Sequence, residues 1–237
     1  MQEVIFQDLG HKSYKEVWDY QELLLKQNVD LKQAAFISPQ SDVKQVDTQH
    51  HLLFVEHSPV YTLGKSGKEE HVLISEAERA ERGIEYFHIN RGGDITFHGP
   101  EQLVGYPILD LDKFKTDLGW YLRSLEEVII LTMADYGLKG ARSSGETGVW
   151  LDPDIKGKER KICAMGIKCS RWITMHGFAF NINTDLRYFD YIVPCGIQDK
   201  AVTSLEKELG HTVPMEEVKQ KVLTHFQAVF QCHISGL

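Results

Sequence analysis

One cysteine of the chain stands in a setting that suits a nucleophilic thiol. Cys195 lies directly between Pro194 and Gly196. Proline restricts the backbone before the thiol and glycine lets the chain bend after it, so the pattern predicts a side chain presented at a turn. Because a thiol is mostly protonated near neutral pH, nucleophilic catalysis would require a cation or a base beside Cys195.

The other three cysteines are expected to be structural. Most free cysteines are buried and unreactive, and this is our interpretation of Cys163, Cys169 and Cys232. None of the four cysteines belongs to a C-x-x-C pair. We therefore expect free thiols in a reducing compartment, with no metal site and no cofactor.

Three kinds of residue could activate Cys195: His98, His176, or a lysine within residues 156–161. If Lys161 opens a strand, alternation places it on the same face as the odd-numbered residues from Cys163 to Cys169. That row is otherwise apolar, and burial there would favour the neutral amine, which can accept a proton. A solvated lysine remains the ordinary interpretation, so the residues alone leave the choice open.

A glycine-containing stretch, RGGDITFHGP at residues 91–100, could approach a ligand closely. Two adjacent glycines, Gly92 and Gly93, lack Cβ atoms, while Arg91 and His98 supply hydrogen-bond donors. A tight turn between strands is the alternative interpretation. The stretch matches neither the phosphate-binding P-loop pattern nor the G-x-G-x-x-G pattern of dinucleotide sites, so a nucleotide phosphate site is not predicted.

Composition narrows the class of protein. The chain has 237 residues, a net charge of −8 and 42% hydrophobic residues, which predicts one soluble folded domain spanning residues 1–237. The acidic balance argues against nucleic-acid binding, because tracking a phosphate backbone needs excess lysine and arginine. The apolar runs are too short to cross a bilayer and no signal peptide is visible, so we expect no membrane partner and a cytoplasmic location.

Alternating apolar residues and helical periodicity predict strands mixed with helices. Strands are expected near residues 4–6, 51–56, 161–169 and 173–182. Helices are expected after Ser13, over residues 117–136 with Gly137 at the end, and from Pro214 onward. Because the order is not a strict alternation, we expect an α/β (α+β) fold with a mixed β-sheet flanked by helices.

Six motifs together resemble the lipoyl(octanoyl) transferases, a family that moves an octanoyl group from acyl carrier protein to a lysine of a lipoyl domain. The resemblance runs from about Val55 to Leu205, and the order of the motifs is the family's order. The motifs are HSPVYTLG at 57–64, RGGDITFHGP at 91–100, GYPILDL at 105–111, KICAMG at 161–166, HGFAFN at 176–181 and PCG at 194–196.

The resemblance implies a fold shared with the catalytic domains of biotin and lipoate protein ligases. It also implies that Cys195 is the nucleophile that carries the acyl group as a thioester. Lys161 would promote ionisation of that thiol and act as general acid and base. The implied acyl-site residues are Arg91, Gly92, Gly93, Asp94, Ile95, Thr96, Phe97, His98, Ala164, Met165, Gly166, Gly177, Phe178 and Ala179.

The implied reaction is the first step of endogenous protein lipoylation. The donor would be octanoyl-acyl carrier protein, and the acceptor a lipoyl domain of a 2-oxoacid dehydrogenase or the glycine cleavage H protein. Both partners are usually acidic, and residues 156–171 carry six cations and one acid. We expect this basic stretch to dock them.

Three other functions remain possible from the sequence. An ATP-dependent lipoate or biotin ligase can share the fold but needs no nucleophilic cysteine. An amidotransferase that moves the acyl group between two lipoyl domains could use Cys195 with a different donor. A non-catalytic module could hold an acyl chain or a lipoyl domain without reacting.

Overall fold

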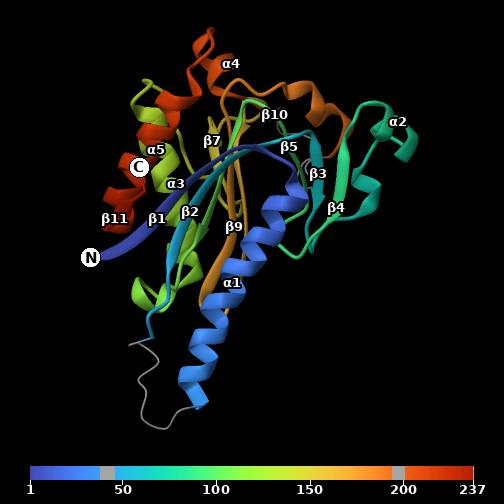
Figure 1. Ribbon diagram of the computed structural model, residues 1–237. Helices are drawn as coiled ribbons and strands as arrows, with labels where there is room; N and C mark the ends of the chain where they lie inside the picture. Colours follow the sequence, from blue (N-terminus) through green and yellow to red (C-terminus); the bar gives the residue numbers. More distant parts are fainter. Residues whose placement is uncertain (38–45, 194–200, 237) are drawn as a thin grey trace.

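The computed structural model describes residues 1–37, 46–193 and 201–236, and a mixed sheet runs through its centre (Figure 1). The strands of this sheet lie in the order β10-β8-β9-β6-β2-β1-β11, and β7 pairs with β8. Their bounds are β1 (Gln2–Lys12), β2 (His50–His57), β6 (Gln102–Ile108), β7 (Val149–Leu151), β8 (Arg160–Ser170), β9 (Ile173–Asn181), β10 (Ala201–Val202) and β11 (Cys232–Ser235).

Both strand directions occur in this sheet. Neighbours β2, β6, β9 and β8 are antiparallel, whereas β1 is parallel to β2 and to β11. All strands predicted from the sequence are present: residues 4–6 lie in β1 and residues 51–56 in β2, while β8 and β9 correspond to the strands predicted at 161–169 and 173–182. The predicted mixed sheet is therefore confirmed.

A second, three-stranded sheet stands beside the first. In it β3 (Val60–Leu63) lies between β4 (Glu85–His88) and β5 (Ile95–His98). Its buried side chains, among them Tyr61 and Phe97, form an apolar cluster separate from the main core. The predicted stretch at residues 91–100 thus connects β4 to β5 and then includes β5 itself.

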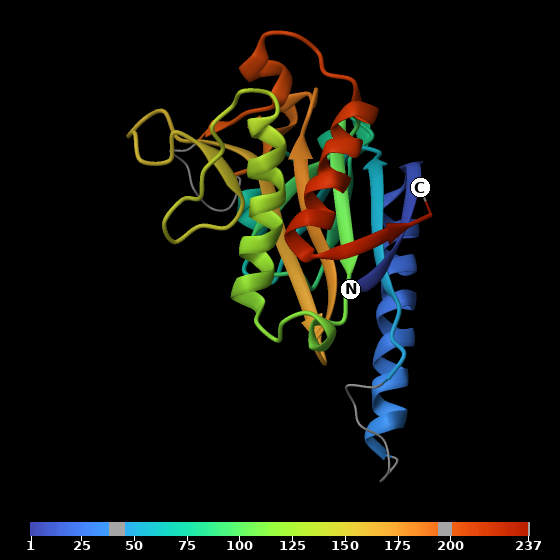
Figure 2. The ribbon, with the colours of Figure 1, turned by 90° about the vertical axis from the view of Figure 1, so that its left-hand side faces the viewer.

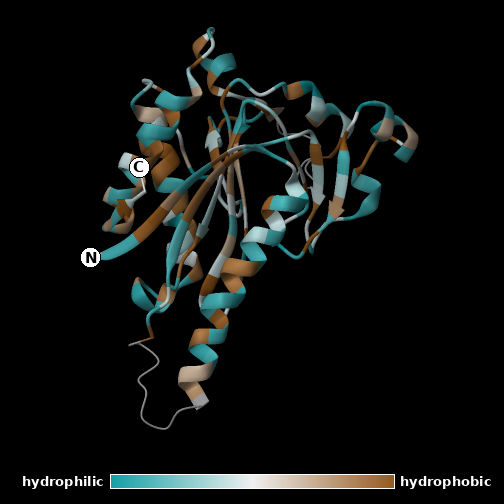
Figure 3. Ribbon diagram, viewed as in Figure 1, coloured by the Kyte–Doolittle hydropathy of each residue, from teal (hydrophilic) through white to brown (hydrophobic). Residues whose placement is uncertain are grey.

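Helices cover both faces of the main sheet. On one face α3 (Leu118–Ala134) and α5 (Met215–Phe230) lie next to each other and enclose the largest apolar cluster (Figure 2). On the other face α1 (Tyr14–Ile37) packs Val17, Leu24 and Leu25 onto the sheet. Hydrophobic and hydrophilic residues alternate along α1, as its one-sided burial requires (Figure 3).

The predicted helix ends have identifiable causes. The backbone N–H of Glu16 donates to Ser13 Oγ at 3.3 Å, just before the first turn of α1. Asp117 caps α3 by accepting the N–H of Trp120, and Gly137 beyond its end has a φ of 74°. Pro214 is the N-cap of α5. These three helices confirm the predictions for the corresponding segments.

Short helices complete the described chain. They are η2 (Glu69–His71), α2 (Glu76–Glu81), η3 (Leu111–Lys113), η4 (Leu186–Tyr191) and α4 (Leu205–Leu209). Within residues 1–37, 46–193 and 201–236, no helix combines the length and the apolar character that crossing a bilayer requires.

Candidate active site

A cavity of about 450 Å³ lies between the main sheet and the loops around the second sheet. Strands β8, β9 and β6 contribute to its walls, together with residues 91–98, residues 145–147 and the start of α1. The lining residues include Lys161 and every predicted acyl-site residue except Gly92 and Phe97. They are Arg91, Gly93, Asp94, Ile95, Thr96, His98, Ala164, Met165, Gly166, Gly177, Phe178 and Ala179. Segments that are distant in sequence thus meet in one cavity.

Lys161 reaches the cavity because of an irregularity in β8. Cys163 pairs with Val149, and Lys161 pairs with Trp150, so Ile162 is an extra residue with no partner on β7. Ile162 and Cys163 both point into the main core and are fully buried. The predicted alternation, which placed Lys161 on the face of Cys163, is therefore wrong, because the bulge returns Lys161 to the opposite face.

The indole of Trp150 supports the amine of Lys161. The Nζ atom lies 4.6 Å from the centre of the ring, a distance typical of a cation–π contact. Trp150 itself is only 2% exposed, so the ring is held by the surrounding packing. Val202 of β10 pairs with Lys161 on its other side. Backbone pairing on both sides and the indole together restrict where this amine can lie.

Small residues form the floor of the cavity. Ala164 pairs with Ala179, and Gly166 pairs with Gly177, across the β8–β9 ladder. A Cβ atom at Gly166 would lie 2.9 Å from both the Arg91 side chain and the carbonyl of Gly92. Gly166 is therefore required for the 91–93 segment to cross directly over β8.

Arg91 is held against the floor by neutral acceptors. Its guanidinium donates to the carbonyl of Thr62 at 2.6 Å, to Thr62 Oγ1 at 3.0 Å and to the carbonyl of Gly92 at 3.0 Å. The N–H of Gly92 donates to the carbonyl of Ile167 at 2.9 Å. Gly92 does not line the cavity, and its observed contact ties the segment to β8.

Phe97 points away from the cavity. Its ring stacks on that of Tyr188 with the two ring centres 4.6 Å apart, within the apolar cluster of the second sheet. Alternation along β5 explains the difference, since Thr96 and His98 line the cavity while Phe97 between them faces the other way.

The hydrogen-bond partners of His98 determine its tautomer. Gln102 donates from Nε2 to the carbonyl of Phe97 and to Asn181 Oδ1, so its Oε1 can only accept. His98 Nδ1–H therefore donates to that oxygen at 2.9 Å, and Nε2 carries the lone pair. Burial, followed by the proximity of His57, lowers the pKa of His98 to about 3, which keeps the ring neutral.

A second buried histidine orients Tyr106. His57 Nδ1 faces the carbonyl of Lys12 at 3.0 Å and must carry the proton, so His57 Nε2 accepts. The hydroxyl of Tyr106 then donates to His57 Nε2 at 2.8 Å, and the lone pairs of its oxygen are left as acceptors. Burial lowers the pKa of His57 to about 4, consistent with this neutral pair.

His176 is the most unusual residue of the lining. It is 2% exposed, its φ is 61°, and among the described residues neither ring nitrogen has a hydrogen-bond partner. Burial, reinforced by the charges of Arg91 and Lys168, lowers its pKa to about 3. The sequence offered His176 only as one candidate base, and its positive φ gave no sequence signal because histidine is not glycine.

Residues 145–147 line the cavity although the sequence did not identify them. Their position depends on Glu126 of α3, which is fully buried and accepts the N–H of Gly148 at 3.1 Å. The other oxygen of Glu126 accepts from Arg123 at 2.6 Å and from Arg142 at 3.0 Å. Gly145 and Gly148 were the only hint of a tight loop here, and Glu126 had the helical spacing of an ordinary core position.

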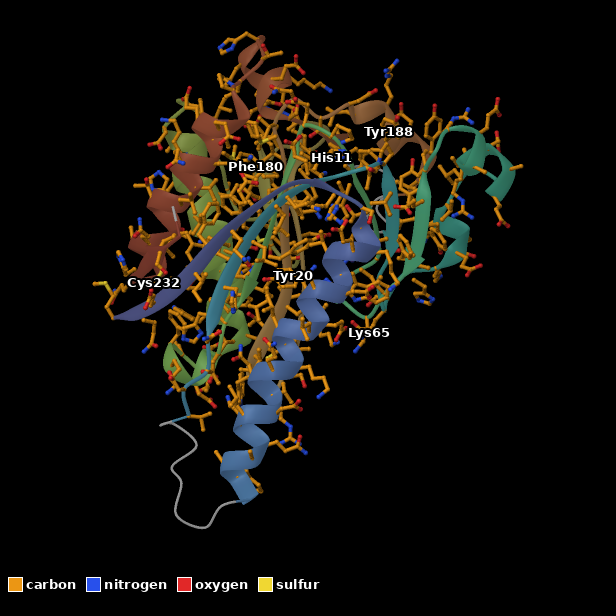
Figure 4. All side chains as sticks on the ribbon, in the orientation of Figure 1. His11, Tyr20, Lys65, Phe180, Tyr188 and Cys232 are labelled. Atoms are coloured by element: carbon orange, nitrogen blue, oxygen red, sulfur yellow. The ribbon has the colours of Figure 1, made fainter. Side chains whose placement is uncertain are left out.

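None of the three described cysteines is suited to ionise. Cys163 is fully buried, and burial raises its pKa well above the usual range. Burial likewise raises the pKa of Cys232 to about 11 and raises that of Cys169. Cys163 and Cys232 are buried as predicted, whereas Cys169 is only partly buried; Cys232 lies on β11, at the far edge of the sheet (Figure 4). Cys195, the predicted nucleophile, lies outside the described residues.

The basic stretch at residues 156–171 does not form one patch. Arg160 is paired with Glu208 at 2.7 Å and with Asp152 at 2.6 Å, and Lys168 is paired with Glu22 at 2.8 Å. The eleven-residue strand β8 separates the cations before it from Arg171 beyond its end. The cations therefore divide between the two ends of β8, about 35 Å apart, and the docking of acidic partners by this stretch stays a prediction.

Comparison with known proteins identifies relatives over almost the whole chain. Residues 13–227 match the family model described as the lipoyl protein ligase A/B catalytic domain. The octanoyltransferase of Christiangramia forsetii is 57% identical over 98% of this chain and 97% of its own length. That of Flavobacterium psychrophilum is 56% identical over 96% of this chain and 97% of its own length.

Solved structures show the same fold at low sequence identity. The bi-partite lipoate protein ligase of Thermoplasma acidophilum covers 100% of this chain and 86% of its own, with 13% identity and a TM-score of 0.69. The biotin protein ligase of Aquifex aeolicus in complex with biotin and ATP matches 98% of this chain and 71% of its own, with 15% identity and a TM-score of 0.52. The fold expected from the sequence, shared by lipoate and biotin ligases, is confirmed.

Proposed function

Because the chain belongs to the family of lipoyl protein ligase A/B catalytic domains, we propose that it transfers an octanoyl group from acyl carrier protein to a lysine of a lipoyl domain. Relatives named octanoyltransferase, 54–57% identical over nearly the full chain, support octanoyl transfer in protein lipoylation. The chain is accordingly an acyltransferase. We further propose that it acts in the cytoplasm, on lipoyl domains of 2-oxoacid dehydrogenases or on the glycine cleavage H protein.

The residues that line the cavity are the main support for this proposal. Lys161 lies in the same cavity as an aliphatic and small-residue wall that includes Ala164, Met165 and Ala179. An amine beside a space shaped for an acyl chain is what proton transfer during acyl transfer requires.

In the proposed reaction Cys195 acts through a covalent intermediate. Its thiolate attacks the thioester carbonyl of the carrier-bound octanoyl group, the carrier thiol leaves with a proton, and the acyl group remains on Cys195. One thioester is exchanged for another, so this step is close to isoenergetic. The high pKa values of Cys163, Cys169 and Cys232 support the choice of Cys195 among the four cysteines.

Lys161 would take the proton of the thiol in the first step and the proton of the acceptor lysine in the second. The neutral acceptor amine attacks the Cys195 thioester, an amide bond forms, and the thiol is released. Conversion of a thioester into an amide is strongly favourable, so the proposed reaction needs no ATP. The lone pair of His98 Nε2 would be available to orient an N–H group of the incoming amine.

Mass spectrometry of the intact enzyme tests this function. After incubation with octanoyl-acyl carrier protein we expect one octanoyl adduct, located by peptide mapping on Cys195 and not on Cys163. Cys195→Ser should lose the adduct and the transfer activity, while Cys163→Ala, the matched control, should keep both. An adduct on Cys163, or turnover by Cys195→Ser at the parent rate, would refute the assignment.

The same assay separates the remaining functions. Product formed from free octanoate and ATP would identify a ligase. Product formed from an octanoylated lipoyl domain, but not from the carrier protein, would identify an amidotransferase.

A further inference from the structure

The inner part of the cavity contains hydrogen-bonding groups that the chain itself does not satisfy. His176 is buried to 98% of its surface, since 2% is exposed, and lines the cavity. Both of its ring nitrogens lack a partner within the described part of the chain. Buried polar groups are normally paired with protein atoms, ordered water or a ligand, so the two unpaired nitrogens mark a place in the cavity where a polar group can bind.

The backbone at His176 is arranged to turn the ring into this position. Its φ of 61° is rare for a residue with a side chain, and strained residues of this kind cluster at functional sites. The N–H of His176 donates to Gln21 Oε1 of α1 at 3.0 Å. The ring then lies near Tyr106, with a T-shaped arrangement and 6.5 Å between ring centres.

A hydroxyl group can pair with one of the two ring nitrogens, either as donor to its lone pair or as acceptor of its N–H. A neutral imidazole offers one N–H donor and one lone pair, and a hydroxyl offers one donor and two lone pairs. The oxygen of Tyr106 adds an acceptor at this end, because its own proton is used on His57. A hydrocarbon end alone would leave all of these groups unsatisfied.

The position of His176 along the sheet fits the far end of a medium-length chain. His176 pairs with Ile167, which follows Lys161 by six residues on β8, one of them the extra residue at position 162, so their Cα levels are about 17 Å apart. Side chains on a strand stand roughly perpendicular to the sheet, so their own length changes this separation little. A hydrogen bond of about 3 Å at each end adds about 6 Å to the length of an acyl chain. An extended eight-carbon chain spans about 9 Å.

We propose that His176 forms a subsite for a hydroxyl at the distal end of the acyl chain, so that the enzyme also transfers ω-hydroxyacyl groups such as 8-hydroxyoctanoyl. This inference rests on the proposed function in one respect, that the acyl carbonyl is held at the Lys161 end. In the added reaction the same bonds form and break as with octanoyl, and the distal hydroxyl is not consumed.

Competition between two donors tests the subsite. We expect the parent enzyme to transfer 8-hydroxyoctanoyl from carrier protein with a kcat/KM at least as high as that for octanoyl, because only the hydroxyl pairs with the imidazole. His176→Phe keeps a ring but removes both hydrogen-bonding atoms. It should lower the ratio of kcat/KM for 8-hydroxyoctanoyl to kcat/KM for octanoyl about tenfold. His176→Asn keeps a donor and an acceptor and tolerates a positive φ, and should retain more of that ratio. A 3-hydroxyoctanoyl donor, whose hydroxyl lies near the carbonyl, is the control and should be unaffected by either change.

Binding of free 8-hydroxyoctanoate and free octanoate, measured by calorimetry, gives the comparison without turnover. If the parent does not transfer octanoyl but His176→Phe selectively weakens the binding of 8-hydroxyoctanoate, the proposed function is refuted and the subsite is supported. The subsite is overturned if folded His176→Phe shows the same ratio of affinities for the two free acids as the parent, or if the parent does not transfer 8-hydroxyoctanoyl. Either result indicates that the imidazole binds water.

Discussion

Lys161 and Trp150 face each other across the β7–β8 pair, with the amine 4.6 Å from the centre of the indole ring. Lysine is long and flexible, and a proton-transfer group must be held close to its target. The ring limits the positions open to the amine, since the amine lies within cation–π distance of the aromatic face.

Replacement of Lys161 should abolish proton transfer while leaving the fold intact. Lys161→Gln is expected to lower kcat about a hundredfold or more, the usual effect of removing a general acid or base. Its side chain is only partly buried, so the melting temperature should change little. Steady-state kinetics with thermal denaturation checks both statements, and a variant with parental kcat would remove Lys161 from the mechanism.

Replacement of Trp150 separates its packing from its contact with the amine. Trp150→Leu and Trp150→Phe both shorten a buried side chain and should lower stability by about 1–3 kcal/mol. Only Trp150→Leu removes the aromatic face, so its kcat should fall clearly below that of Trp150→Phe. Equal kcat values in two variants of similar melting temperature would show that the ring acts through packing alone.

Glu126 should control the cavity through the 145–147 loop. Glu126→Gln places an N–H group where the carboxylate accepts from Arg123, Arg142 and Gly148, and should therefore release this loop. We expect a several-fold higher KM for the acyl donor, with kcat less affected. Glu127→Gln is the matched control, because the neighbouring Glu127 is only partly buried and also pairs with Arg142. Equal KM values in the two variants would contradict this role.

Stability should fall on mild acidification because of the buried histidines. The pKa is about 4 for His57 and about 3 for His98 and His176 in the folded chain, against 6.5 for an ordinary histidine. Between these values the unfolded chain binds more protons, so the free energy of unfolding decreases as the pH falls from about 6.5 toward 4.

Urea denaturation at several pH values measures this dependence. His57→Gln, which removes one of these groups, should make the slope between pH 6.5 and 4 shallower than in the parent; His50, whose pKa burial also lowers to about 4, contributes in both proteins. A free energy of unfolding that stays constant over this interval would show that these rings are not held neutral.

The elements of the fold could largely be predicted, because their signals are local. Apolar periodicity and end residues such as Asp117 and Gly137 depend only on neighbouring positions. The bulge at Ile162 could not be predicted, since it depends on how β8 pairs with β7. Strict alternation consequently placed Lys161 on the wrong face.

Site residues that belong to sequence motifs could be predicted. Properties that depend on which side chains pack together in the folded chain could not. Arg91, Ala164 and Gly177 belong to motifs and line the cavity. Phe97 belongs to the same motif as Arg91, but alternation along β5 turns it into the neighbouring cluster. The unpaired nitrogens of His176 become visible only when the surrounding partners are known.

The extra residue at position 162 adds a buried side chain to the core without changing the strand partner of Lys161. Deletion of Ile162 would leave Lys161 directly beside Cys163, and regular alternation would then keep Lys161 on the cavity face, opposite Trp150. The deletion should therefore lower stability, through the lost core side chain, more than it displaces the amine.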